Sequence, residues 1–161
     1  MVNQKLQEAV NREINAEFAS AYLYLSLAAH FSSTGLPGFA HWMKVQAQEE
    51  VGHALRFFDH LVDRGGRVTL MAIDQPPGEF GSAVSVFEQV LERERAISAA
   101  INDLHDLAVQ ESDHASLPLL LSFIAEQIEE EKAAADILDQ LRMVGEQKGS
   151  LLFLDRHLAK R

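Results

Sequence analysis

The sequence predicts an all-α fold: a four-helix bundle with one long connection and a short fifth helix at its C-terminal end. Apolar residues recur at alternating steps of three and four through four long segments, as on a helix face that packs in a bundle. Gly- and Pro-containing segments interrupt this pattern. No segment shows the apolar–polar alternation that is typical of a β-strand.

The first two helices are predicted to form a hairpin. The first covers about residues 3–32, and one face of it carries Val10, Ile14, Glu17, Ala21, Tyr24, Ala28 and Phe31. A turn at Gly35-Leu36-Pro37-Gly38 follows, and Pro37 suits the first turn of the next helix. The second helix runs to about residue 64, and its inner face carries Phe39, Met43, Gln46, Glu50, His53 and Phe57.

The third and fourth helices are predicted to form a second hairpin. Residues 65–81 contain Pro76-Pro77 and no helical period, so they read as a long connection, after which Ser82 can cap the third helix. The inner face of the third helix carries Phe87, Leu91, Glu94, Ser98 and Ile101. The fourth begins near 113–116, and its inner face carries Leu120, Phe123, Gln127, Glu130, Ala134, Ile137, Leu141 and Val144.

A short fifth helix is predicted after the second hairpin. Gly145 and Gly149 are expected to end the fourth helix, and Ser150 to cap a helix over about residues 151–158. Two short turns and one long crossover join two antiparallel hairpins. This topology resembles that of the ferritin-like bundles.

Composition excludes several classes of function. A formal net charge of −10 disfavours nucleic-acid binding, which needs clustered Lys and Arg, and is compatible with attracting cations. Without cysteine the chain has no disulfide, thiolate zinc site, iron–sulfur cluster or thiol nucleophile. No run approaches the roughly 18 apolar residues of a membrane span, and no signal segment follows the start. We expect a soluble, cytoplasmic protein with one domain over residues 1–161.

Polar residues interrupt the inner faces of all four helices. They are Glu17, Glu50, His53, Glu94, Gln127 and Glu130. An unpaired carboxylate in such a position would cost several kcal/mol. The first and third helices carry Glu17 and Glu94 at similar distances from the turns that follow them, so we expect these polar residues to meet at mid-bundle.

An internal repeat links the two hairpins. Glu17 and Glu94, Glu50 and Gln127, and His53 and Glu130 are each separated by 77 positions. A bundle with this repeat brings four carboxylates, one imidazole and one amide together, and two bridged cations would neutralise them. Glu50 and His53 lie at i and i+3, the spacing at which two helical side chains can bind one metal. The oxygen-rich set favours iron and leaves manganese open.

At these residues the chain resembles a non-haem bacterial or archaeal ferritin from end to end. The resemblance rests on Glu17, Tyr24, the run Gln48-Glu49-Glu50-Val51-Gly52-His53, Glu94 and the run Glu126-Gln127-Ile128-Glu129-Glu130-Glu131-Lys132. It implies that Glu17, Glu50 and His53 bind one iron ion of a dinuclear centre. Glu94 and Glu130 would bind the second ion, with Glu50 as the bridge, and Gln127 would orient a ligand water or oxygen species.

The resemblance also implies roles for residues beside the centre. Glu49, Glu126 and Glu129 match a third iron site that shares Glu130, although a solvated acidic face would explain the same residues. Tyr24 matches a tyrosine that hydrogen-bonds to a ligand or donates an electron, although it could also simply fill the core.

Two departures separate the chain from bacterioferritins. Glu130 stands where the His of a second Glu-x-x-His motif would fall, and Gly52 stands where those proteins bind haem through a methionine. We therefore expect no haem.

The resemblance implies iron storage with ferroxidase activity. Fe(II) would be oxidised by O2 or H2O2 and kept as ferric mineral inside a homo-oligomeric shell, usually of 24 subunits, that is closed or open. Two alternatives remain: a di-iron oxidase or peroxidase without a storage role, and a non-enzymatic helical interaction protein.

Overall fold

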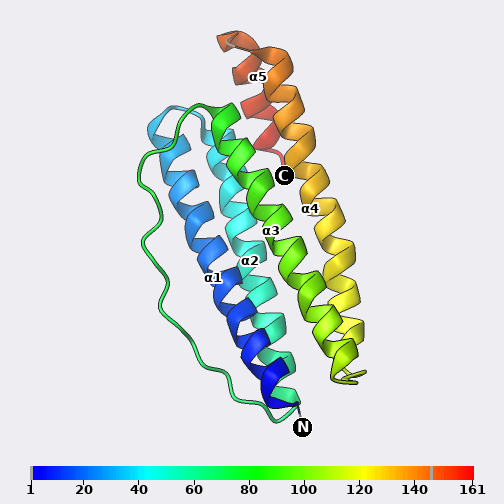
Figure 1. Ribbon diagram of the computed structural model, residues 1–161. Coiled ribbons are helices and arrows are strands. Elements are labelled where there is room, and N and C mark those ends of the chain that lie inside the picture. Colours follow the sequence, from blue (N-terminus) through cyan, green and yellow to red (C-terminus); the bar gives the residue numbers. More distant parts are fainter. Residues whose placement is uncertain (1, 146) are drawn as a thin grey trace.

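The computed structural model describes residues 2–145 and 147–161, and in these ranges every regular element is a helix. The bundle helices are α1 (Gln4–Ser33), α2 (Pro37–Asp63), α3 (Ala83–Gln110) and α4 (Leu117–Val144). A short helix, α5 (Lys148–Leu158), follows. The predicted four-helix bundle with a fifth helix is confirmed (Figure 1). No helix of the described ranges combines the length and apolar character that a membrane crossing requires.

The helices pack as two antiparallel hairpins, α1 with α2 and α3 with α4. The connection between α2 and α3 runs along the outer side of α1, from one end of the bundle to the other (Figure 1). Hydrogen bonds hold it there: Asn11 Nδ2 donates to the carbonyl of Arg67 at 2.9 Å, and Ser26 Oγ donates to that of Pro77 at 2.8 Å. The long crossover is therefore an ordered strap that joins the hairpins.

Two apolar clusters form the core, one toward each end of the bundle. One is built around Tyr24, Phe31, Phe39, Met43, Trp42 and Phe87, and the other around Leu6, Ile14, Phe57, Leu61, Ile101 and Phe123. Stacked rings fix both clusters, with Phe57 and Phe123 centroids 4.2 Å apart in the second. The polar residues of the inner faces lie between the clusters, so the core is divided at mid-height.

Helix α5 is fastened to the start of α2. The first turn of α2 has no side-chain cap of its own, and the buried Asp155 of α5 supplies one by accepting the N–H groups of Gly38 and Phe39 at 2.8 and 2.9 Å. This approach requires glycine at position 38, because a Cβ there would lie 1.7 Å from the backbone oxygen of Asp155. The long-range pair thus fixes where α5 lies.

The start of α5 differs from the prediction. Helix α4 ends at Val144, and Gly145 with its positive φ of 55° is the C-cap, as expected, but Gly149 and Ser150 both lie inside α5. The N-cap residue is Gln147, so the expected cap at Ser150 is wrong. The physical reason is that helix geometry already holds from Lys148, and a glycine is tolerated within a helix at a cost of about 1 kcal/mol.

Candidate metal centre

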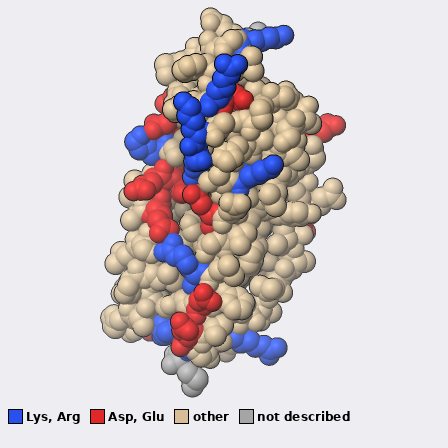
Figure 2. All heavy atoms as spheres, turned by 180° about the vertical axis from the view of Figure 1, so that it is seen from behind, with Lys and Arg blue, Asp and Glu red and all other residues tan. Residues whose placement is uncertain are grey.

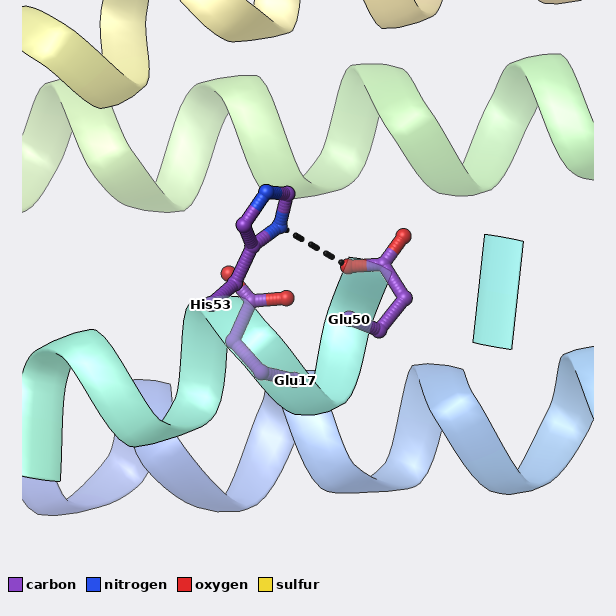
Figure 3. Close-up of side chains that lie close together, drawn as sticks. All are labelled: Glu17, Glu50 and His53. Atoms are coloured by element: carbon purple, nitrogen blue, oxygen red, sulfur yellow. Dashed lines mark hydrogen bonds and ion pairs between the residues drawn. The ribbon is translucent and has the colours of Figure 1, made fainter. Parts of the chain in front are cut away.

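Three predicted ligands meet at mid-bundle, where Glu17 extends from α1 toward Glu50 and His53 of α2 (Figure 3). Each offers one possible ligand atom, and these atoms all lie within 4.8 Å of one another. The glutamates are 1% exposed and the His53 side chain 12% exposed. His53 Nδ1 lies 3.2 Å from Glu50 Oε2. Two carboxylates and an imidazole at this spacing can hold a divalent cation.

The Glu17 carboxylate is the most informative group of the cluster. Neither of its oxygens has a hydrogen-bond partner, although both are buried. Burial, followed by repulsion from Glu50, raises the pKa of Glu17 well above its ordinary value. Buried polar groups in folded proteins are nearly always paired, so this side chain fits a site that a cation completes.

Glu94 of α3 is buried beside two residues that the sequence also singled out: Gln127, through the 77-residue repeat, and Tyr24, through the family resemblance. It accepts a hydrogen bond from the Tyr24 hydroxyl, and Gln127 Nε2 lies 3.3 Å from both its carbonyl oxygen and its Oε2. Burial, followed by repulsion from Glu50, raises the pKa of Glu94 to about 7. Tyr24 and Gln127 therefore both contact this carboxylate directly.

Burial is the main cause that raises the pKa of Glu130 on α4; repulsion from Glu49 and Glu50 also raises it, whereas the hydrogen bond from Gln46 and the charge of Arg161 lower it. Glu130 Oε2 accepts a 2.6 Å hydrogen bond from Gln46 Nε2. The charge of Glu50 thus contributes to the raised pKa of a carboxyl group on α3 and of one on α4.

Comparison with known proteins identifies the family. The family model described as "Ferritin-like domain" matches residues 7–144. The chain belongs to the ferritin family. Bacterial non-heme ferritin from Bacteroides fragilis strain 638R is 42% identical over 161 residues, which cover 100% of both chains. The corresponding protein from Staphylococcus saprophyticus is 34% identical, and the match covers 100% of this chain and 96% of that one.

Ferritin structures give the same result. A "novel open pore ferritin" from the archaeon Archaeoglobus fulgidus matches with a TM-score of 0.98 and 49% sequence identity, over 100% of this chain and 99% of that one. A "Humanized Archaeal ferritin" matches with a TM-score of 0.99 and 48% identity over the same shares. The family resemblance and the ferritin-like fold expected from the sequence are both confirmed.

The three carboxylates assigned to a third ferritin iron site are arranged differently from those of the central cluster. Glu49 Oε2 lies 2.6 Å from Arg161 Nη2, and Glu126 Oε2 lies 2.6 Å from Arg56 Nη1. Glu129 is exposed on α4. Glu126 does reach the centre, with its Oε2 3.5 Å from His53 Nε2. Arginine side chains thus hold two of these three carboxylates.

Two polar residues beside the ferritin centre were given no role from the sequence. Gln46 was placed on the inner face of α2, and its contact with Glu130 depends on helix α4, which sequence spacing alone does not reveal. Glu13 lies one turn before Glu17, and its Oε1 is buried without a partner. Burial raises the pKa of Glu13 to about 7, although the nearby Arg93 guanidinium lowers it. The i to i+4 spacing to Glu17 was the available signal.

Proposed function

We propose that this chain is the subunit of an iron-storage ferritin that oxidises Fe(II) at a dinuclear centre and deposits ferric mineral in a shell. Family membership supports iron storage. The observation that carries the catalytic part is the buried Glu17 carboxylate, whose oxygens lack partners beside Glu50 and His53.

The proposed ligand roles follow the two sides of the centre. Glu17, Glu50 and His53 bind the first iron ion, since their ligand atoms already lie close together. Glu94 and Glu130 would bind the second, and Glu50 would bridge the two ions, as the family resemblance implies. This dinuclear assignment is a proposal.

Two further residues act around the second ion. Gln127 reaches Glu94 with its amide nitrogen, which leaves its oxygen able to orient a water or oxygen species. The Tyr24 hydroxyl positions the Glu94 carboxylate and lies where an electron could pass to the centre.

The proposed reaction moves two electrons to one oxidant. Two Fe(II) ions each lose one electron, and O2 takes up both electrons and two protons to give H2O2. With H2O2 as the oxidant, the same two electrons and two protons yield two water molecules. Oxygen ligands such as Glu17, Glu50 and Glu94 favour the harder Fe(III) product over Fe(II).

Storage requires many subunits, because a single bundle encloses no cavity for mineral. We propose a homo-oligomeric shell, with 24 subunits as the working number. Large apolar side chains near α5 support an assembly surface: Met143 is 78% exposed and Phe153 is 76% exposed. The similar ferritin of Archaeoglobus fulgidus is described as an open pore ferritin, so we leave open whether the proposed shell is closed or open. A single domain and a cytoplasmic location stay predictions.

A di-iron oxidase without a storage role is the second candidate, since the same central cluster would serve it. The third candidate, a non-enzymatic helical interaction protein, would not explain why both buried oxygens of Glu17 have no hydrogen-bond partner. The retention of mineral therefore separates the main proposal from its rival.

The test is to add Fe(II) aerobically to the purified apoprotein, at hundreds of ions per assembly, and to follow ferric absorbance and particle size together. Rapid oxidation with soluble iron retained in a large particle supports a storage ferritin. Oxidation that stops near two ions per chain supports the oxidase, and no oxidation refutes the ferroxidase assignment.

A further inference from the structure

Two arginines, Arg56 and Arg161, lie on the carboxylates that would make a third iron site. Arg56 Nη1 donates to both oxygens of Glu126, at 2.6 and 2.9 Å. Arg161 Nη2 donates to Glu49 Oε2 at 2.6 Å. Seen from behind the view of Figure 1, acidic side chains gather at mid-height on the surface, with basic side chains above and below them (Figure 2). Each arginine belongs to a different part of the chain.

Arg161 is held by three groups of α2. Besides Glu49, its Nη1 donates to Gln46 Oε1 at 2.5 Å, and its guanidinium lies over the Trp42 ring, 4.8 Å from the centroid. Its side chain is 26% exposed. Because Gln46 in turn donates to Glu130 at 2.6 Å, Arg161 is one residue removed from a carboxylate of the proposed second iron position.

The Arg56 side chain also has two contacts besides its carboxylate partner, both with residues of α4. Its Nη2 donates to Ser122 Oγ at 2.7 Å, and its guanidinium lies over the Phe123 ring, 4.0 Å from the centroid. Its carboxylate partner, Glu126, also approaches His53. Stacking on a ring orders the fork of an arginine in advance, so less entropy is lost in each hydrogen bond that it makes.

A guanidinium and a metal ion compete for the same carboxylate oxygens. Arg56 uses both oxygens of Glu126, and Arg161 uses one oxygen of Glu49. A cation that enters between Glu49, Glu126 and Glu129 must displace these contacts and withstand the repulsion of two fixed positive charges. An isolated surface ion pair would carry little weight. These two pairs are reinforced by ring stacking and by a second hydrogen-bond partner each.

We propose that Arg56 and Arg161 compete with a third cation for its carboxylate ligands. Arg56 holds Glu126 and Arg161 holds Glu49, so that this site binds iron weakly and releases it readily. The inference rests on the proposed function, since it takes the central ligands to bind two ions tightly. It assigns to both arginines the role of limiting the affinity for the third ion through the carboxylates that they hold.

The experiment is an anaerobic Fe(II) titration of the apoprotein, followed by calorimetry and by metal analysis after equilibrium dialysis. Wild type, Arg56→Gln, Arg161→Gln and Arg161→Lys are compared with Arg142→Gln. Arg142 forms a 2.9 Å ion pair with Glu88 and is exposed, so its loss removes the same charge away from the site. Helical circular dichroism and particle size confirm that each variant is folded and assembled.

We expect two tightly bound ions per chain in every protein. In Arg56→Gln and Arg161→Gln the affinity for a third ion rises on the order of tenfold, because one positive charge near a divalent ion is removed. Arg161→Lys, which keeps the charge, shows a smaller rise, and Arg142→Gln shows none.

Other results are equally decisive. Equal third-ion affinity in wild type and in both Gln variants, with two tight ions retained, overturns the role of the arginines and leaves the dinuclear centre intact. Fewer than two tight ions in wild type overturns the dinuclear centre, and this inference falls with it. A rise of the same size in Arg142→Gln shows a general charge effect and also overturns the assignment.

Discussion

Replacing Glu94 by Gln should make the apoprotein more stable at alkaline pH. The pKa of Glu94 is raised from 4.5 to about 7, mainly by burial, so the folded state binds its proton more tightly than the unfolded chain does. The contribution of the protonated Glu94 to the free energy of unfolding is fully present below pH 4.5, and it is lost as the pH rises through 7. A shift of this size corresponds to about 3 kcal/mol of unfolding free energy above pH 8. Gln keeps the shape and carries no charge, so the loss disappears.

Glu13 provides a matched control for this experiment. Its pKa is also about 7, with burial as the main cause, but it is not assigned as an iron ligand. Urea unfolding of apoprotein at fixed subunit concentration is measured at pH 5 and pH 8.5 for wild type, Glu94→Gln and Glu13→Gln. For each variant, the difference in unfolding free energy from wild type should be about 2 to 3 kcal/mol larger at pH 8.5 than at pH 5. Only Glu94→Gln should lose a tightly bound Fe(II) ion.

If Glu94→Gln raises the free energy of unfolding by the same amount at both pH values, the pKa of Glu94 is not raised by folding. In that case the carboxylate is as easily ionised in the folded state as in the unfolded chain. Retention of both tight ions in Glu94→Gln, together with the expected pH effect, would leave the electrostatics intact and remove Glu94 from the ligand set.

Further predictions concern the centre and the fastening of α5. Glu50→Ala should abolish rapid Fe(II) oxidation, measured by stopped-flow absorbance, because it removes the proposed bridge; a rate equal to that of wild type contradicts that role. Fe(II) binding at pH 6 should release a proton from Glu94, because its pKa of about 7 keeps most of this carboxyl protonated in the apoprotein, and a pH-stat titration measures that proton; binding without proton release would contradict the raised pKa. Asp155→Ala should cost about 1 to 2 kcal/mol in urea unfolding, because the N–H groups of Gly38 and Phe39 lose their acceptor; unchanged stability would show that this cap contributes little.

The fold was predictable because its information is local. The spacing of residues such as Phe31, Phe39 and Phe123 defines the buried faces, and glycine and proline mark the turns. The four bundle helices therefore begin and end close to the predicted residues. The start of α5 was misplaced because Gln147 caps it without a side-chain hydrogen bond, so its position leaves no sequence signal.

The central residues were predictable for a different reason: a charge on an inner face needs an explanation. Glu17, Glu50 and Glu94 interrupt apolar faces at repeated positions, and the structure buries all three. Their burial is observed, whereas their roles as iron ligands stay predictions. The same argument could have identified Glu13, which lies one turn from Glu17, but it has no counterpart in the repeat: the position 77 residues later is Val90.

The arginines beside the centre could not be found in this way, because their partners are distant in sequence. Arg161 contacts Glu49 across 112 positions, and Arg56 contacts Glu126 across 70. On the sequence alone each is a charged residue on a helical or terminal segment, where exposure is the ordinary expectation. What distinguishes them is that each stacks on an aromatic ring and reaches a carboxylate next to the centre. Family motifs identify carboxylates that can bind iron, but whether those carboxylates are free to do so depends on cations that the motifs do not include.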